Sequence, residues 1–243
     1  MHLLRGEDLS VNYGARNVFS RLNVSVTGGR FIALIGPNGS GKSSLLRVLG
    51  GAQQPTHGRV SRTGRVALIA PSGDPPGDLT PLDLASYGLS VRRRFWQWSL
   101  SVTEEQRIRD ALARANIADR ADDPMTHLSA GEVQRAWIAA ALATAPDVLL
   151  VDEPTTHLDL RYQVEILQTL ATLAASGVSV VVAIHDLTLA ARFADEVALI
   201  ANGKLQTGPA DEVLEAETLS DAFGITVGTH RHPHDGYLIC LPS

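Results

Sequence analysis

The chain contains 243 residues, enough for one large domain or two small ones. Hydrophobic residues make up 44% and charged residues 19%, which permits a sizeable core and argues against a disordered chain. The formal net charge of -5 disfavours nucleic acid as a partner, because phosphate binding favours a basic protein.

Nothing in the sequence indicates an export signal or a membrane span. The single cysteine, Cys240, cannot form an internal disulfide. The longest apolar stretches, residues 137–143 and 178–184, fall far short of the about 20 residues that cross a bilayer. We therefore expect a cytoplasmic protein that reaches a membrane only through a partner.

The first third of the chain predicts a β flap followed by a strand, a loop and a helix. Residues 9–13 and 18–27 alternate between apolar and polar side chains, which is typical of antiparallel strands. Residues 30–35 form a short apolar run that predicts a buried strand, and a helical pattern runs from Lys42 to the glycine pair at residues 50–51.

The rest of the chain predicts an α/β fold with a mostly parallel core sheet. Further strands are expected at residues 65–69, 147–151 and 178–184, with a helix over 161–175. The stretch 75–143 has a helical composition and is predicted to be an inserted helical subdomain. We expect one domain over residues 1–243, with a core from 1–74 and 144–225 and an extension at 226–243.

The loop after the strand at 30–35 matches the phosphate-loop pattern G-x-x-x-x-G-K-[ST] at every fixed position. Its glycines let backbone N–H groups turn toward phosphates at a helix N-terminus. The lysine reaches the β- and γ-phosphates, and the serine hydroxyl is a ligand for Mg²⁺. The pattern predicts a nucleoside triphosphate site, formed by Gly36, Pro37, Asn38, Gly39, Ser40, Gly41, Lys42 and Ser43.

Two acids follow the strand at 147–151 and are the second half of that predicted site. Asp152 is expected at the carboxyl edge of the sheet, where it can hold Mg²⁺ through its water shell. Glu153 is expected to point the other way and to polarise an attacking water molecule. Taken alone, such adjacent acids are equally compatible with a simple helix cap.

The segment Leu128-Ser129-Ala130-Gly131-Glu132 resembles the signature of ATP-binding cassette (ABC) ATPases, L-S-G-G-[QE]. By itself it is better explained as an ordinary serine N-cap with an acid in the first turn. The order of the other motifs supports the resemblance, which spans nearly the whole chain: the phosphate loop, the signature, the paired acids, Asp159 in Thr-Thr-His-Leu-Asp, and His185.

The resemblance implies roles for these residues. Tyr13 is expected to stack on adenine, Ser44 joins the phosphate loop in binding ATP, and His185 contacts the γ-phosphate. Glu153 is expected to be the catalytic base, and Ser43 and Asp152 to hold Mg²⁺. The signature residues are expected to contact ATP on a second copy of the chain, with Asp159 at that interface; they are Ser129, Ala130, Gly131 and Glu132.

Within this family the chain looks most like the importer ATPases that serve ferric siderophores, haem and cobalamin. The resemblance implies a closed dimer around two ATP molecules, a membrane permease as partner, an external binding protein as indirect partner, and a location on the cytoplasmic face of the membrane. Alternatives are an exporter ATPase, a soluble ABC-type ATPase such as one for iron–sulfur assembly, and a nucleotide-gated module that barely hydrolyses.

One departure from the family pattern stands after the strand at 65–69. Family members carry a glutamine there that links Mg²⁺ to the membrane partner, whereas this chain has Pro71 and Ser72. Metal affinity or coupling is expected to change, but hydrolysis is expected to survive. Ala130 is a milder departure, since a methyl group need not block the Gly131 N–H.

Three other segments carry less specific patterns. Residues 92–98 (RRRFWQW) combine cations with aromatics and suit either a membrane-partner contact or a solvated helix end with packed tryptophans. The run His230-Arg231-His232-Pro233-His234 is predicted to be a solvated loop rather than a metal site. Cys240 is predicted to be a buried small hydrophobe.

Overall fold

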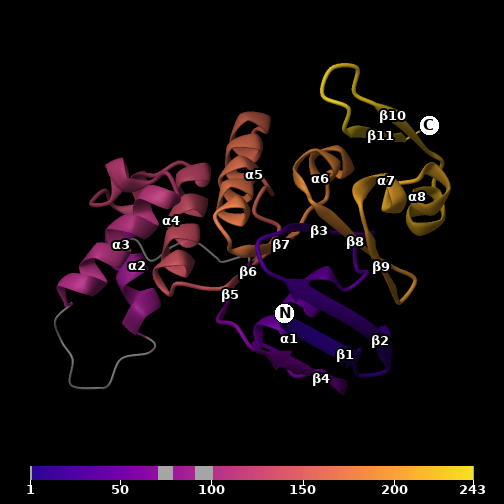
Figure 1. Cartoon of the computed structure of the whole chain (residues 1–243), viewed down its shortest axis with the longest axis horizontal. Coiled ribbons are helices and arrows are strands. Elements are labelled where there is room, and N and C mark those ends of the chain that lie inside the picture. The colour runs from indigo at the N-terminus through magenta and orange to yellow at the C-terminus, as the bar shows by residue number, and fades with distance from the viewer. Residues whose placement is uncertain (1, 71–78, 91–100, 243) are drawn as a thin grey trace.

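A computed structural model describes residues 2–70, 79–90 and 101–242 (Figure 1). The predicted segments 71–72 and 92–98 lie outside these ranges. The strands are β1 (His2–Tyr13), β2 (Arg16–Thr27), β3 (Phe31–Ile35), β4 (His57–Arg62), β5 (Val66–Ile69), β6 (Val148–Asp152), β7 (Ser179–Ala183), β8 (Glu196–Ala201), β9 (Lys204–Gly208), β10 (Val227–Arg231) and β11 (Leu238–Pro242). The α-helices are α1 (Lys42–Gly50), α2 (Pro81–Ser90), α3 (Val102–Arg114), α4 (Ala130–Ala143), α5 (Leu160–Ala175), α6 (Leu187–Phe193), α7 (Ala210–Val213) and α8 (Ala216–Phe223).

The core is a six-stranded sheet in the order β5-β6-β7-β3-β8-β9, parallel except for the last strand. Strands buried on both faces are expected to be apolar throughout, and β3 is fully buried along its length. Its side chains alternate: Phe31, Ala33 and Ile35 join the cluster that includes α5, whereas Ile32 and Leu34 join the one that includes α1. The predicted α/β class with a mostly parallel sheet is confirmed.

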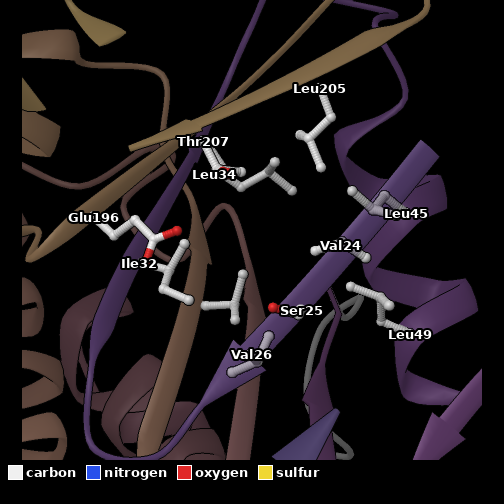
Figure 2. Close-up of a pocket in the computed structure, with 12 residues that line it drawn as sticks. Val24, Ser25, Val26, Ile32, Leu34, Leu45, Leu49, Glu196, Leu205 and Thr207 are labelled. Carbon is white, nitrogen blue, oxygen red and sulfur yellow. The ribbon is translucent and has the colours of Figure 1, made fainter. Parts of the chain in front are cut away.

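The N-terminal flap is a separate antiparallel sheet in the order β2-β1-β4. Figure 2 shows where it meets the core: Val24 and Val26 of β2 point toward Leu45 and Leu49 of α1. The space enclosed between the flap and the core is only about 20 Å³, and most of the residues that line it are apolar, with Ser25, Glu196 and Thr207 as the polar ones. The flap is therefore closely packed on α1, and this packing places the end of β1 beside the phosphate loop.

The helical part consists of α2, α3 and α4 and lies at one end of the molecule (Figure 1). Two of its helices begin with a capping box, in which a serine side chain and a glutamate three residues later satisfy each other's backbone N–H groups. The pairs are Ser101 with Glu104 at α3 and Ser129 with Glu132 at α4. Within the described residues, no helix is both long and apolar enough to cross a membrane.

The C-terminal segment forms an antiparallel hairpin of β10 and β11, in which Thr229 pairs with Cys240. The predicted solvated loop over 230–234 is thus only partly correct, because His230 and Arg231 extend β10 and the turn begins after them. His232 stacks on Tyr237, with ring centroids 4.7 Å apart, and this contact orders the turn. Among the described residues, no group of three His, Cys, Asp or Glu side chains is placed to hold a metal ion.

Candidate active site

Three neighbouring strands of the core sheet bring the predicted site residues together. β6, β7 and β3 are adjacent and parallel, so their carboxyl ends meet at one edge of the sheet. The phosphate loop follows β3, the paired acids end β6, and His185 follows β7. Ligands of open α/β sheets bind at this edge, which is where the sequence predicted the site.

The phosphate loop adopts a conformation that requires glycine at its start. Gly36 has φ 149°, and a Cβ on it would overlap the carbonyl oxygen of Ile200 in β8. The loop then runs directly into α1, whose N-cap is Gly41. The free N–H groups of the first turn of α1 point toward the loop, and they give this end of the helix a partial positive charge.

Lys42 is buried inside the loop with only 5% of its surface exposed. Its Nζ donates hydrogen bonds to the carbonyl oxygens of Gly36 at 2.8 Å and Pro37 at 3.3 Å. Burial lowers the pKa of Lys42, while the nearby charges of Glu153 and Asp152 act in the opposite direction. The ammonium group is thus held in the loop by two carbonyl oxygens.

Asp152 faces the start of α1 and is 3% exposed. The Ser43 hydroxyl donates to its Oδ1 at 3.0 Å, but its Oδ2 is buried without a hydrogen-bond partner among the described residues. Burial raises the pKa of Asp152, and the Ser43 hydrogen bond opposes that shift. A buried carboxylate oxygen without a partner beside a serine hydroxyl suits a hard divalent cation such as Mg²⁺, so the residues fit the predicted metal.

Glu153 and His185 form a direct pair at the same edge. His185 Nε2 lies 2.7 Å from Glu153 Oε1, and both side chains are partly exposed. Glu153 has φ 51°, a left-handed conformation that is unfavourable for a non-glycine residue and is frequent at functional sites. This backbone turn gives the two neighbouring acids different partners, Ser43 for Asp152 and His185 for Glu153.

A pocket of about 220 Å³ opens between the flap and the phosphate loop. Tyr13 stands at its rim, half exposed, with its hydroxyl 3.1 Å from Ser44 Oγ and 2.9 Å from Gln53 Oε1. Its lining consists of eight sequence-predicted residues and two that were not predicted: Tyr13, Arg16, Val18, Asn38, Gly39, Gly41, Lys42, Ser43, Ser44 and Glu153. The predicted residues Gly36, Pro37, Ser40, Asp152 and His185 are not part of this lining.

Arg16 is the most informative of the residues that sequence reasoning missed. It is exposed on β2, and its guanidinium lies 3.2 Å from the position that a Cβ on Gly39 would occupy. It is a cation between the predicted adenine platform and the phosphate loop. Its position three residues after Tyr13 was the available signal, but only the turn between β1 and β2 brings it to the pocket.

The signature segment lies elsewhere, at the start of α4. Ser129 Oγ donates to Glu132 Oε2 at 2.7 Å, and the two backbone hydrogen bonds of the capping box are also present. The hydrogen bonds from Ser129, with lesser help from Arg120 and Arg135, lower the pKa of Glu132. Ser129 and Glu132 are half-buried and Gly131 is buried, whereas Asp159, at the N-cap of α5, is exposed and makes no side-chain capping bond. Ser129, Gly131 and Asp159 are not among the residues lining the 220 Å³ pocket of this single chain.

Comparison with known proteins identifies the family to which this chain belongs. Residues 19–156 match the family model described as ABC transporter. The chain is 35% identical to the ferric enterobactin transport ATP-binding protein FepC of Escherichia coli K12, covering 98% of this chain and 93% of that protein. It is also 35% identical to the hemin import ATP-binding protein HmuV of Thermobifida fusca, covering 99% and 88%.

Solved structures give the same result. One, described as an inward-facing metal-chelate type ABC transporter, aligns over 100% of this chain and 98% of its own with a TM-score of 0.91 and 27% identity. A dimeric bacterial ABC transporter cassette aligns over 85% of this chain and 98% of its own, with a TM-score of 0.72 and 26% identity. The chain belongs to the ABC transporter family as an ATP-hydrolysing subunit.

Proposed function

We propose that this chain powers a membrane importer for an iron chelate or haem by hydrolysing ATP as a head-to-tail dimer. The observation that carries the proposal is the convergence of Lys42, the Ser43–Asp152 pair and the Glu153–His185 pair at one edge of the sheet. The cargo class rests on the printed functions of the similar proteins, which include ferric enterobactin transport and hemin import.

ATP binding is assigned to the pocket between the flap and the phosphate loop. The exposed ring of Tyr13 offers an aromatic face for adenine, and its hydroxyl is anchored by Ser44 and Gln53. Lys42 exchanges its two carbonyl partners for β- and γ-phosphate oxygens. Arg16 adds a second cation on the flap side of the same phosphates.

The Ser43 hydroxyl and the Asp152 carboxylate would hold Mg²⁺. When bound, the cation neutralises charge on the β- and γ-phosphates. Asp152 Oδ2, which lacks a hydrogen-bond partner among the described residues, supports this assignment. Burial keeps that oxygen out of water, so ion binding satisfies a group that is otherwise unpaired.

Hydrolysis is assigned to the Glu153–His185 pair. Glu153 accepts a proton from the attacking water, and His185 Nε2, now 2.7 Å from the Glu153 carboxylate, hydrogen-bonds the γ-phosphate when ATP is bound. The left-handed backbone at Glu153 holds its carboxylate at the pocket while Asp152 stays buried. The two acids thus divide metal binding and proton transfer between them.

A second copy of the chain completes the site. The signature residues do not line the pocket of their own chain, and the dimeric cassette to which the chain is similar supports a two-chain arrangement. Ser129 and Gly131 of each copy would face the ATP of the other, with Asp159 at the same interface.

We also propose that residues 1–74 and 144–225 form the core of one domain, 75–143 the helical subdomain and 226–243 an extension.

The similar proteins are named as transport and import ATP-binding proteins, which supports a separate membrane permease as the partner and the cytoplasmic face of the membrane as the location. An external binding protein is the further, indirect partner. An exporter subunit and a soluble ABC-type ATPase remain as alternatives, and both share the site chemistry.

The test is steady-state hydrolysis of Mg-ATP by the wild-type chain and by Glu153→Gln, together with their molar mass in solution at saturating Mg-ATP. The amide cannot accept a proton, so kcat should fall at least about 100-fold, the usual contribution of a general base. The variant should persist as a dimer with bound ATP. The matched control is Glu165→Gln on α5, away from the pocket, which should keep wild-type turnover. A wild-type chain that binds ATP without hydrolysing it would favour the nucleotide-gated module.

A further inference from the structure

Helix α6 begins immediately after the predicted γ-phosphate contact. His185 and Asp186 connect β7 to α6, and the Asp186 side chain caps the helix by accepting from the Leu189 N–H at 2.9 Å. The position of His185 therefore depends on how the first turn of α6 is held. This helix has only seven residues, and Leu189, Ala190 and Ala191 anchor it in the hydrophobic core.

The C-terminal hairpin packs directly on that first turn, as Figure 1 shows for β11 and α6. The backbone N–H of Cys240 in β11 donates to Thr188 Oγ1 in α6 at 3.2 Å. Leu238 and Cys240 pack against the same hydrophobic cluster as Leu187 and Phe193 of α6. The edge of β11 that does not pair with β10 is thus joined to α6 by a hydrogen bond and by apolar contact.

The other end of α6 is held by the turn of the same hairpin. The Arg192 guanidinium carbon lies 5.7 Å from the centroid of the Tyr237 ring, which stacks on His232. Burial raises the pKa of the Cys240 thiol to about 11, with a smaller contribution from the charge of Asp186. The thiol is therefore neutral and packed beside the residue that follows His185.

We infer that the β10–β11 hairpin is a positioning element for His185, acting through Thr188 on the first turn of α6. This inference rests on the proposed function, because it assumes that His185 contacts the γ-phosphate. Thr188 itself does not line the nucleotide pocket. Loss of the Thr188 hydroxyl should therefore reduce the rate of hydrolysis while leaving ATP binding nearly unchanged.

The experiment compares Thr188→Val, which keeps the shape but removes the acceptor, with Thr188→Ser, which restores it. For Thr188→Val we expect kcat to fall about threefold to tenfold, as for the loss of one hydrogen bond, with KM for ATP unchanged within about twofold. Thr188→Ser should return kcat to within about twofold of wild type. In a His185→Ala background, single-turnover rates should no longer respond to Thr188→Val, because the group it positions is gone.

Leu241→Ala is the matched control, since Leu241 lies on β11 but is 51% exposed and should leave kcat unchanged. If Thr188→Val does not fold, Tyr237→Ala tests the same idea from the distal end of α6, with a fall in kcat that also disappears in the His185→Ala background. The inference is overturned if these variants keep wild-type kcat, or if the loss persists without His185. If wild type hydrolyses no ATP at all, the proposed function fails first.

Discussion

Asp152 is a site residue whose buried carboxylate is expected to lower the stability of the folded chain. Its carboxylate is buried, one of its oxygens has no partner among the described residues, and its pKa is raised by that burial. A buried charge without a full set of partners costs folding free energy unless a ligand completes it. Asp152 is therefore expected to destabilise the metal-free protein, and its benefit is expected to come from binding Mg²⁺.

Asp152→Asn should raise the Tm of the chain in EDTA at pH 7 by about 2–4 °C, the shift that ~1 kcal/mol produces in a chain of this size. Because the folded-state pKa is raised above the ordinary 3.8, the cost appears as pH rises through that folded-state pKa and is absent at lower pH. The gain in Tm should accordingly shrink at pH 4. The same variant should lose Mg²⁺-dependent ATP binding.

Asp147→Asn is the control for that prediction. Asp147 lies next to the other end of β6, where its carboxylate accepts from the Arg65 backbone N–H at 2.7 Å and forms an ion pair with the Arg65 side chain. Its removal should not raise Tm. A Tm of Asp152→Asn at or below wild type at pH 7 would contradict the account of Asp152.

Individual site residues were predictable to different degrees. Lys42, Ser43 and Asp152 follow from local patterns, because a phosphate loop and a strand ending in an acid carry their chemistry in consecutive residues. Arg16 was not predictable in this way. It reaches the pocket only because the flap packs on α1. This is a contact between segments far apart in the chain, and neither local sequence indicates it.

At the scale of elements, the start of α4 depends on its contact with α5. A Cβ on Gly131 would lie 2.9 Å from Cδ1 of the Tyr162 ring, closer than side chains normally approach. The same glycine is the predicted N–H donor to the partner's ATP. Close packing of α4 on α5 and the function of the signature thus require the same residue.

Gly131→Ala should lower Tm despite the better helix propensity of alanine, by about 2–12 °C for the 1–3 kcal/mol typical of overpacking. It should also weaken ATP-dependent dimerisation in the Glu153→Gln background, measured by sedimentation. Adding Tyr162→Ala should recover part of the lost Tm, because the clash is removed. If Gly131→Ala keeps wild-type Tm and dimerisation, the Tyr162 ring does not exclude a side chain at position 131.

Elements with strong periodicity were predicted well, and those without it were not. The runs that became β3, β6 and β7 are apolar throughout, and α5 carries a clear apolar face. β4 and β9 were missed because they are mostly exposed and mixed in composition. β8 contains the apolar run Val197–Ile200 and could have been recognised, whereas the β10–β11 hairpin is short and rich in histidine and proline near its turn.

At the scale of the whole molecule, the site is divided between two surfaces. The flap and the carboxyl edge of the sheet form the nucleotide pocket, while the helical part presents the signature elsewhere. If the signature of a second copy completes the site, as we propose, nucleotide would control the association of the two chains. Dimer closure would then couple ATP hydrolysis to a membrane partner.

Purification of this ATPase from the membranes of its native host, in mild detergent, tests directly whether it works on a membrane permease. Partners that come with the chain are identified by mass spectrometry. We expect a hydrophobic multi-span permease in stoichiometric amount, retained when the Glu153→Gln variant is used as the bait. Recovery only from the soluble fraction, with soluble partners, would contradict it and favour a soluble ABC-type ATPase.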